Sequence, residues 1–308
     1  MQRASTKQED LSTLIVLVGP TGVGKTALSI RLAQYFGCSI LSADSRQIFR
    51  EIPIGTAAPS DEERVAVPHY FVGTRSVTEP YSAATFESEV LELLPQVFAE
   101  SSSSSALLSG GSMMYVDAIT KGIDSMPDVP EEVRSAVWER YAAEGLDGIL
   151  AELHLLDPVY YKAVDPKNYK RVLHGYEVCL ATGRPFSSFH TGQQKARPFR
   201  IVKVGLTRDR EELYARIDKR VELMIESGMV EEAQRVYPLR RLNALNTVGY
   251  KELFSYFDGD IDFAEVVRLI QRNSRHYARK QLSWWRRDPE IRWFHPDAWE
   301  EIIAYIHR

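Results

Sequence analysis

Cysteine is nearly absent from this sequence. Only Cys38 and Cys179 occur among 308 residues, which excludes a fold held together by a disulfide framework. Two thiols are compatible with a reducing cytoplasm, and we expect both side chains to be buried or neutral.

Long apolar runs are missing as well. The longest aliphatic run near the N-terminus is Leu14–Val18, whereas a membrane-spanning helix needs about 20 apolar residues. Residues 1–12 are polar, include Glu9 and Asp10, and lack the apolar centre of a signal peptide. We therefore expect a cytoplasmic protein that has no membrane partner.

The chain also lacks a strong excess of positive or negative charge. The formal net charge is −4, which by itself indicates no nucleic-acid partner. Hydrophobic residues make up 44% of the chain and charged residues 26%, values that exclude a wholly disordered or collagen-like chain. A length of 308 residues fits one large domain or two modest ones.

Short aliphatic segments alternate with amphipathic helical segments at both ends of the chain. This alternation predicts an α/β fold in which helices cover both faces of a parallel sheet. The predicted strands are residues 14–18, 38–43, 69–73, 106–109, 201–206 and 291–294. The predicted helices of this part are residues 25–36, 82–100, 113–120, 209–227, 229–240, 249–257 and 261–287.

The middle of the chain follows a different pattern. Residues 130–182 have helical apolar spacing without a convincing strand, and they end at the Gly183–Pro185 segment. We therefore expect residues 123–195 to form an all-helical insertion. Residues 1–122 and 196–308 are then expected to form the α/β core.

Residues 19–26 form a glycine-rich loop between a predicted strand and a predicted helix. They match the pattern G-x-x-x-x-G-K-[ST], which in this context predicts a P-loop NTPase-like fold. Backbone N–H groups of such a loop bind phosphate, Lys25 neutralises phosphate oxygens, and the Thr26 hydroxyl is suited to ligating Mg²⁺. The diphosphate-binding residues predicted in this way are Gly19, Pro20, Thr21, Gly22, Val23, Gly24, Lys25 and Thr26.

The position of the nearest acid argues against simple NTP hydrolysis. An ATPase or GTPase normally has an acid after a second aliphatic strand, but the strand at 106–109 is followed by Gly110–Ser112, which has none. Asp44 instead follows the strand at 38–43, at a strand end where open α/β sheets bind ligands. There it can orient Mg²⁺-bound water or take a proton from a nucleophile. The structural alternative is that Asp44 caps a helix.

Five arginines near the C-terminus recur at helical intervals. Their intervals of 4, 3, 4 and 7 residues predict one basic helix face. No acid occurs between the first of them and Arg287, and aromatic residues are interleaved, as on nucleic-acid-binding surfaces. A solvated helix face is the alternative. The five residues are Arg268, Arg272, Arg275, Arg279 and Arg286.

Two weaker features concern other charged residues. Arg216, Lys219 and Arg220 form a smaller basic group that acids interrupt, so we expect surface or phosphate-neutralising side chains rather than an independent site. The seven histidines have no metal-ligand spacing with the cysteines, so we expect no zinc site.

Motifs along almost the whole chain resemble one enzyme family. They are GPTGVGKT (19–26), ADSRQIFR (43–50), IGTAAPS (54–60), VPHY (67–70), YSAATF (81–86), GGSMMYVDAITKGI (110–123), DP with KRVLHGYEV (165–178), TGRPFS (182–187), VGYKEL (248–253) and RKQLSWWRRD (279–288). Their order and combination are similar to those of bacterial tRNA dimethylallyltransferases, also called tRNA isopentenyltransferases. The phosphate loop alone is unspecific, whereas its combination with the other motifs is specific.

This resemblance implies an activity. The family transfers a dimethylallyl group from dimethylallyl diphosphate to the exocyclic amine of adenosine at tRNA position 37, beside the anticodon. By resemblance, Asp44 hydrogen-bonds the amine and takes its proton, while Lys25 and Thr26 hold the diphosphate and Mg²⁺. Because the target base lies in a stack, we expect it to be flipped into the pocket. Stabilisation of the leaving group then makes ATP hydrolysis unnecessary.

The resemblance also implies which positions contact tRNA. They comprise two stretches and two single residues, to which the arginine pattern adds part of the basic helix. We expect the helical insertion to clasp the anticodon stem-loop and the protein to be a monomer. The tRNA-binding residues are Asp44, Ser45, Arg46, Gln47, Ser112, Arg134, Lys170, Arg171, Val172, Leu173, His174, Arg272, Arg275 and Arg279.

Three other functions compete with this one. A P-loop small-molecule kinase predicts ATP affinity and a mobile arginine-rich lid. A cytokinin-type isopentenyltransferase acts on free AMP, ADP or ATP and needs neither an anticodon clasp nor a basic helix. A non-catalytic RNA-binding module is the third, and the presence of Lys25, Thr26 and Asp44 argues against it.

Overall fold

The computed structural model describes residues 11–308, so Glu9 and Asp10 lie outside the described part. The chain divides into two compact units. The first, here called the core unit, ends at Thr120 and resumes from Ala196 to Arg308, and the second, the lobe, comprises Lys121–Lys195. The lobe therefore begins two residues before the start expected from the sequence.

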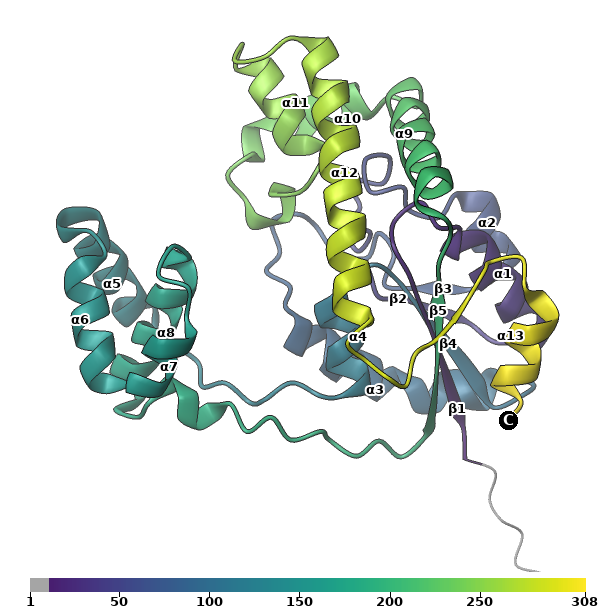
Figure 1. The fold of residues 1–308 in the computed structure, drawn as a ribbon, viewed down its shortest axis with the longest axis horizontal. Helices are drawn as coiled ribbons and strands as arrows, with labels where there is room; N and C mark the ends of the chain where they lie inside the picture. Colours follow the sequence, from purple (N-terminus) through teal and green to yellow (C-terminus); the bar gives the residue numbers. More distant parts are fainter. Residues whose placement is uncertain (1–10) are drawn as a thin grey trace, which may run out of the picture. The chain divides into compact units, whose positions relative to one another are not determined.

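A six-stranded sheet forms the centre of the core unit, and all neighbouring strands in it are parallel. The strand order is β3-β2-β4-β1-β5-β6. Figure 1 labels the strands β1 to β5 of this sheet. The strands are β1 (Thr13–Val18), β2 (Ile40–Ser42), β3 (His69–Tyr70), β4 (Ser105–Ser109), β5 (Arg200–Leu206) and β6 (Arg292–Phe294). The predicted parallel α/β sheet is confirmed.

Side chains of β1 alternate between two hydrophobic clusters. Leu14, Val16 and Val18 belong to one cluster, whereas Ile15 and Leu17 belong to the other. Successive strand side chains point to opposite faces, so helices must cover both faces of the sheet. The α-helices of the core unit are α1 (Lys25–Phe36), α2 (Asp61–Ala66), α3 (Ala83–Glu100), α4 (Met113–Thr120), α9 (Arg210–Glu226), α10 (Met229–Val236), α11 (Tyr250–Phe257), α12 (Phe263–Trp285) and α13 (Trp299–Ile306).

Two helices of the core unit differ from the sequence-based prediction. The short α2 was not predicted, because it buries no residue and so lacks apolar periodicity; only the capping box between Ser60 and Glu63 signals it. The helix predicted at 229–240 ends at Val236 and continues as a 3-10 turn, Tyr237–Leu239. Pro238 has no N–H group with which to continue the α-helix.

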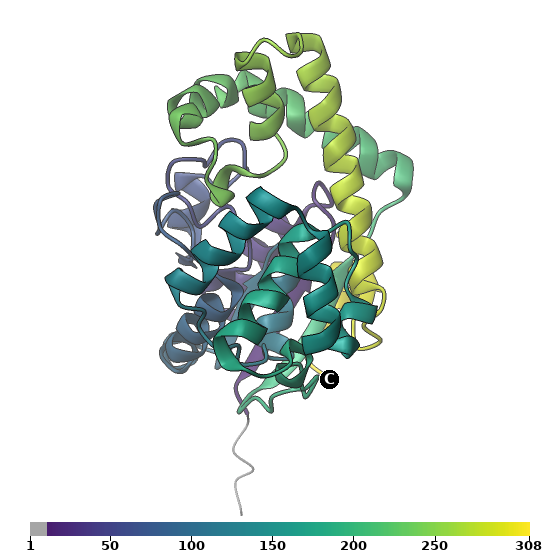
Figure 2. The ribbon, with the colours of Figure 1, turned by 90° about the vertical axis from the view of Figure 1, so that its left-hand side faces the viewer.

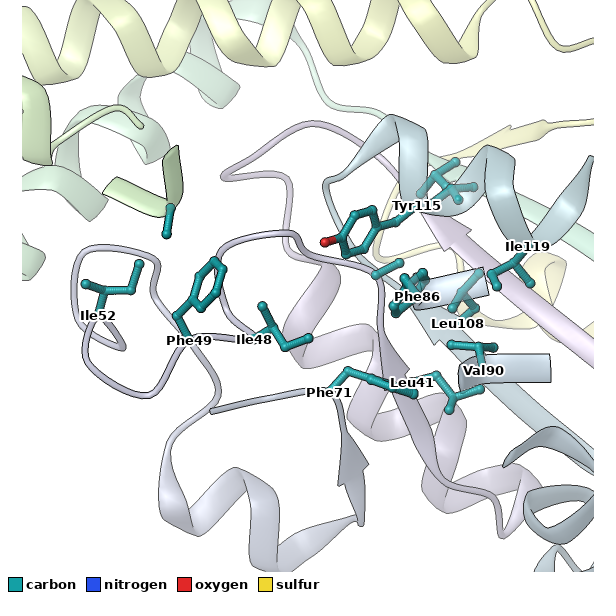
Figure 3. Close-up of a cluster of buried hydrophobic side chains, with 14 of the residues drawn as sticks. Leu41, Ile48, Phe49, Ile52, Phe71, Phe86, Val90, Leu108, Tyr115 and Ile119 are labelled. Carbon is teal, nitrogen blue, oxygen red and sulfur yellow. The ribbon is translucent and has the colours of Figure 1, made fainter. Parts of the chain in front are cut away.

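A hydrophobic cluster holds the segment that follows β2. Ile48, Phe49 and Ile52 are 1%, 4% and 0% exposed, and they belong to the same cluster as Leu41 and Phe71 (Figure 3). This anchoring fixes the turn of residues 45–48, which directly follows Asp44. The turn therefore has a rigid support at the carboxyl end of β2.

The lobe, residues 121–195, contains helices and no strand. Its helices pack against one another (Figures 1 and 2). They enclose their own buried cluster, which includes Val137, Leu153 and Val172. The lobe therefore has a hydrophobic core separate from those of the sheet. Its helices are α5 (Glu131–Glu144), α6 (Asp147–Leu156), α7 (Pro158–Ala163), α8 (Tyr169–Thr182) and the 3-10 helix η1 (Phe186–Phe189).

Both cysteines are buried free thiols, as predicted. Burial raises the pKa of Cys38 to about 12, which keeps this thiol neutral. Among residues 11–308, no helix combines the length and the apolar composition that crossing a membrane requires.

Candidate active site

The loop of residues 19–26 joins the carboxyl end of β1 to the first turn of α1. Gly24 precedes α1 with a φ of 108° and a ψ of 23°, a left-handed conformation that suits glycine. At Gly22, φ is 79° and an added Cβ would lie 2.8 Å from Ile217 Cγ1. Both glycines therefore permit the tight turn that leaves the N–H groups of the α1 N-terminus available to a phosphate.

The Lys25 side chain folds back over this loop. Its Nζ donates hydrogen bonds to Gly19 O at 2.7 Å and to Pro20 O at 3.0 Å. Burial and the nearby Arg220 guanidinium lower the pKa of Lys25 from 10.5 to about 7, although the Asp44 carboxylate acts in the opposite direction. A bound phosphate would add negative charge beside Lys25 and favour its protonated form.

Two arginines hold the loop through its carbonyl groups. Arg208, which follows β5, donates from Nε to Val23 O at 2.9 Å. Arg216 of α9 donates from Nε to Gly22 O at 2.9 Å. Arg208 was not predicted from the sequence as a site residue, although it follows a parallel strand, the same feature that identified Asp44.

Arg220 lies one turn after Arg216 on α9 and interacts electrostatically with Lys25 and Asp44. Burial lowers the pKa of Arg220, while the Asp44 carboxylate raises it. Lys219, by contrast, is exposed and pairs with Glu222 at 3.0 Å. The smaller basic group noted in the sequence therefore separates into Arg216 and Arg220 at the loop and Lys219 at the surface.

Asp44 follows the carboxyl end of β2. Its Oδ1 accepts hydrogen bonds from the backbone N–H groups of Arg46 at 2.9 Å and Gln47 at 3.3 Å. No residue within the described range 11–308 donates a hydrogen bond to Oδ2, which lies beside Gly111: a Cβ added there would be 3.5 Å away. Asp44 therefore caps a turn, not a helix, and keeps one oxygen for a ligand.

The other predicted contact residues of this region surround Asp44. Ser45, Arg46 and Gln47 are partly exposed, and burial lowers the pKa of Arg46. Gln47 Nε2 donates to Thr56 O at 3.2 Å and thereby holds a neighbouring loop. Ser112 follows β4 and is 9% exposed. These side chains lie where the parallel strands β2 and β4 end.

Two residues of α12 also reach this edge of the sheet: Gln281, which was not selected from the sequence, and Tyr277, which was noted there only as an aromatic residue of the basic helix. Gln281 accepts a hydrogen bond from Thr21 N and donates one to Gly111 O, both at 2.8 Å. Tyr277 donates from its hydroxyl to Gly111 O at 3.0 Å, and burial together with the Asp44 carboxylate raises its pKa. Leaving such a buried amide unpaired costs about 1–3 kcal/mol, so these bonds fix α12 against the loop.

The arginine stripe, defined as Arg268, Arg272, Arg275, Arg279 and Arg286, lies on α12 and the residue that follows it. Two of its members are partly neutralised. Arg268 forms two hydrogen bonds of 2.6 Å with Glu265 on the same helix. Arg275 is ion-paired with Asp218, which comes from α9. Acids from outside the run of arginines therefore reduce its charge.

Arg272, Arg279 and Arg286 are the exposed members without such an acid. None of the three forms an ion pair with any residue from 11 to 308. Arg279 donates to the hydroxyl of Tyr214 at 3.4 Å. Among the interleaved aromatic residues, Trp285 is 1% exposed and belongs to the core, as the sequence analysis expected of at least one tryptophan.

The predicted tRNA-binding positions of the lobe divide into exposed and buried side chains. Val172 and Leu173 are both 0% exposed and belong to the core of the lobe. Because α8 turns their side chains inward, only their backbone atoms are available to an RNA, and tRNA contact at these two positions stays a prediction. The exposed positions are Arg134, Lys170, Arg171 and His174.

Few protein side chains at the loop are suited to ligating a metal ion. Within residues 11–308, no group of three or more His, Cys, Asp or Glu side chains is arranged to hold one. Thr26 is exposed in the first turn of α1. Mg²⁺ is often held by few protein ligands together with waters and substrate phosphates, and the Thr26 hydroxyl fits that role.

The parallel sheet and the glycine-rich loop at its carboxyl edge define an α/β protein of the P-loop class. The cations around that loop make it a candidate anion-binding site. The profile of the "IPP transferase" family matches residues 47–288. The chain belongs to this family, the tRNA dimethylallyltransferases, which are prenyltransferases.

Individual relatives are similar over nearly their whole length. The tRNA dimethylallyltransferase 2 of Porphyromonas gingivalis is 66% identical over 286 residues, which cover 93% of this chain and 95% of that protein. The tRNA dimethylallyltransferase 1 of Bacteroides fragilis is 57% identical over 294 residues, covering 96% and 97%. The crystal structure of the tRNA isopentenylpyrophosphate transferase from Bacillus halodurans has a TM-score of 0.70 and 31% identity, covering 96% of this chain and 95% of that one.

Proposed function

We propose that this enzyme transfers the dimethylallyl group of dimethylallyl diphosphate to the exocyclic amine of adenosine 37 of tRNA, next to the anticodon. The observation that supports this most directly is that two partly buried cations, Lys25 and Arg220, lie close enough to the Asp44 carboxylate for it to raise the pKa of both, at the carboxyl edge of the sheet. A leaving diphosphate needs cations, and a nucleophilic amine needs a proton acceptor. We further propose that the enzyme works in the cytoplasm as a monomer.

The phosphate loop binds the diphosphate in this proposal. The N–H groups at the start of α1, together with Lys25 and Arg220, stabilise negative charge as the bond between the allylic carbon and the diphosphate oxygen breaks. Mg²⁺ is the proposed cofactor, held by the Thr26 hydroxyl. When bound, it neutralises charge on the diphosphate.

Asp44 removes the proton that the reaction releases. As the allylic carbon–oxygen bond breaks, the amine nitrogen forms a bond to that carbon and becomes positively charged. Oδ2 of Asp44 takes one proton from this nitrogen, which leaves a neutral secondary amine and free diphosphate. Oδ1 stays bonded to Arg46 N and Gln47 N, and these bonds keep the carboxylate oriented.

Basic side chains of both units hold the tRNA in this proposal. The stripe residues Arg272, Arg275 and Arg279 contact phosphates of the anticodon stem-loop, and so do the exposed lobe residues. The flipped adenosine reaches Asp44 past Ser45, Arg46, Gln47 and Ser112. The proposed lobe contacts are Arg134, Lys170, Arg171 and His174.

One assay separates this function from its competitors. Label from dimethylallyl diphosphate should appear in tRNA and not in AMP, and only when Mg²⁺ is present. Transfer to AMP at an equal rate would support the cytokinin-type alternative, and phosphorylation of a small molecule by ATP would support the kinase. Membership in the tRNA dimethylallyltransferase family favours the tRNA reaction over both.

A further inference from the structure

Gln281 connects three parts of the core unit. Its Oε1 accepts a hydrogen bond of 2.8 Å from Thr21 N in the phosphate loop, and its Nε2 donates one of 2.8 Å to Gly111 O after β4. The side chain belongs to α12 and is only 1% exposed, so water hardly competes for either bond. Arg272 of the stripe lies nine residues earlier, about two and a half helical turns away, and therefore on the opposite side of α12.

The chemistry of its partners fixes the orientation of the Gln281 amide. Thr21 N can only donate a hydrogen bond, and Gly111 O can only accept one. The reversed amide would set donor against donor and acceptor against acceptor. A buried glutamine with two such partners has one favourable arrangement, and it holds both partners at fixed positions.

These two partners belong to the two halves of the proposed reaction site. Thr21 lies in the loop that binds the diphosphate, and its N–H group is committed to Gln281. Gly111 lies beside Asp44, because a Cβ added to Gly111 would be 2.8 Å from Gln281 Nε2 and 3.5 Å from Asp44 Oδ2. The Gln281 amide therefore spans from the leaving-group side of the site to the proton-acceptor side.

We propose that Gln281 is a positioning residue that sets the spacing between the diphosphate loop and Asp44. This inference rests on the proposed function. Tyr277, one turn earlier on α12, assists by donating a second hydrogen bond to Gly111 O at 3.0 Å. The helix that presents the arginine stripe to RNA on one side thus orders the reaction site on its other side.

The test compares variants that remove the two bonds separately or together. Gln281→Leu removes both bonds, Gln281→Glu keeps an acceptor for Thr21 N but loses the donor to Gly111 O, and Tyr277→Phe loses only its own bond. Gln271→Leu is the matched control, because Gln271 lies on the same helix and its side chain makes no hydrogen bond with any residue between 11 and 308.

We expect Gln281→Leu to lower kcat on the order of 10- to 100-fold, because small misplacements of reacting groups have effects of this size. It should also raise the KM for dimethylallyl diphosphate while the Kd for tRNA stays unchanged. Gln281→Glu should also lower kcat, because its carboxylate sets acceptor against acceptor at Gly111 O. Tyr277→Phe should lower kcat less, and Gln271→Leu should match the wild type. A role confined to stability would lower the melting temperature and leave both kinetic constants of the folded protein unchanged.

A folded Gln281→Leu variant with wild-type kcat and KM would overturn the proposal. If that variant does not fold, wild-type constants in both Gln281→Glu and Tyr277→Phe would overturn it instead. Protection from heat by pyrophosphate is measured on the same proteins. If the wild type transfers no label to tRNA, the proposed function fails. Even then, weaker heat protection of Gln281→Leu than of Gln271→Leu by pyrophosphate would support the role of Gln281 in positioning the loop.

Discussion

Arg275 of α12 is ion-paired with Asp218 of α9. The two residues are 57 positions apart in the sequence, and the pair exists because α9 packs against α12. It divides the arginine stripe into members that protein acids partly neutralise and members that remain available to an RNA phosphate. Within α12, Arg272 and Arg279 are thus the strongest candidates for phosphate contacts.

The first prediction concerns these two arginines. Replacing Arg272 and Arg279 with Ala should weaken tRNA binding and reduce the slope of log affinity against log salt by about one unit for each phosphate that the protein no longer neutralises. Affinity for dimethylallyl diphosphate should not change. Filter binding over a range of salt concentrations measures the slope.

Arg268→Ala is the control for this experiment, because Arg268 is already bonded to Glu265. It should change the slope less than either of the other substitutions. An unchanged slope in the double variant would mean that the stripe is a solvated helix face.

The second prediction tests Asp44 as the proton acceptor. Asp44→Asn should lower the rate of transfer on the order of 10²-fold or more, because the amide cannot accept the proton. The variant keeps Oδ1 as an acceptor for Arg46 N and Gln47 N, so the turn and the tRNA affinity should be preserved. Single-turnover kinetics measure the rate, and a cooperative melt like that of the wild type is the control. A near-normal rate would eliminate Asp44 as the base.

The third prediction uses the perturbed pKa of Lys25. In the free protein this pKa is lowered to about 7, and a bound anion raises it. Above about pH 7, binding must therefore be accompanied by proton uptake, and affinity for pyrophosphate should fall by up to about tenfold per pH unit. Below that pH Lys25 is already protonated, and this dependence should disappear.

Lys25→Arg is the matched variant, because an arginine keeps its charge throughout this range. Pyrophosphate itself titrates there, so the difference between wild type and variant isolates the contribution of Lys25. Isothermal titration calorimetry from about pH 6 to 9 provides both curves and the number of protons taken up. Curves of identical shape would show that Lys25 does not titrate on binding.

The fourth prediction concerns Thr26. Thr26→Ala removes the proposed hydroxyl ligand and should raise the Mg²⁺ concentration needed for half-maximal transfer, whereas Thr26→Ser keeps the hydroxyl and should behave like the wild type. A Mg²⁺ titration of the transfer rate distinguishes them. Equal requirements in both variants would rule out the hydroxyl as a ligand.

The fifth prediction tests the lobe as the tRNA clasp. Lys195 N donates to Lys121 O at 2.8 Å, so the two ends of the lobe are adjacent and a short Gly/Ser linker can replace residues 121–195. The buried cluster of the lobe contains no residue of the core unit, so we expect the remaining protein to fold. It should bind dimethylallyl diphosphate and lose transfer to tRNA.

Cooperative melting must establish that this shortened protein is folded before its activity is measured. Transfer to tRNA at the wild-type rate would contradict the clasp and revive the free-nucleotide alternative. Transfer to AMP by the shortened protein is therefore measured in parallel.

Features encoded by neighbouring residues could be predicted from the sequence. The loop of residues 19–26 is a local pattern of glycines with Lys25 and Thr26, and its place between a strand and a helix follows from apolar spacing. Asp44 could be selected because a residue directly after a parallel strand lies at the ligand-binding edge. Helical apolar spacing also predicts that the side chains of Val172 and Leu173 face the core of the lobe, as they do in the structure.

Only the tertiary structure decided which distant side chains complete the site. Gln281 bonds to Thr21 across 260 positions, and the only local sign of this is a polar residue among the buried positions of α12. Arg220 joins Lys25 and Asp44 only because α9 lies against the loop. These contacts depend on how helices pack onto the sheet, and packing is set by the shape of the whole core. The sequence therefore determined the chemistry of the loop and of Asp44, and the fold determined their charges, their spacing and the part of the basic helix that remains free for RNA.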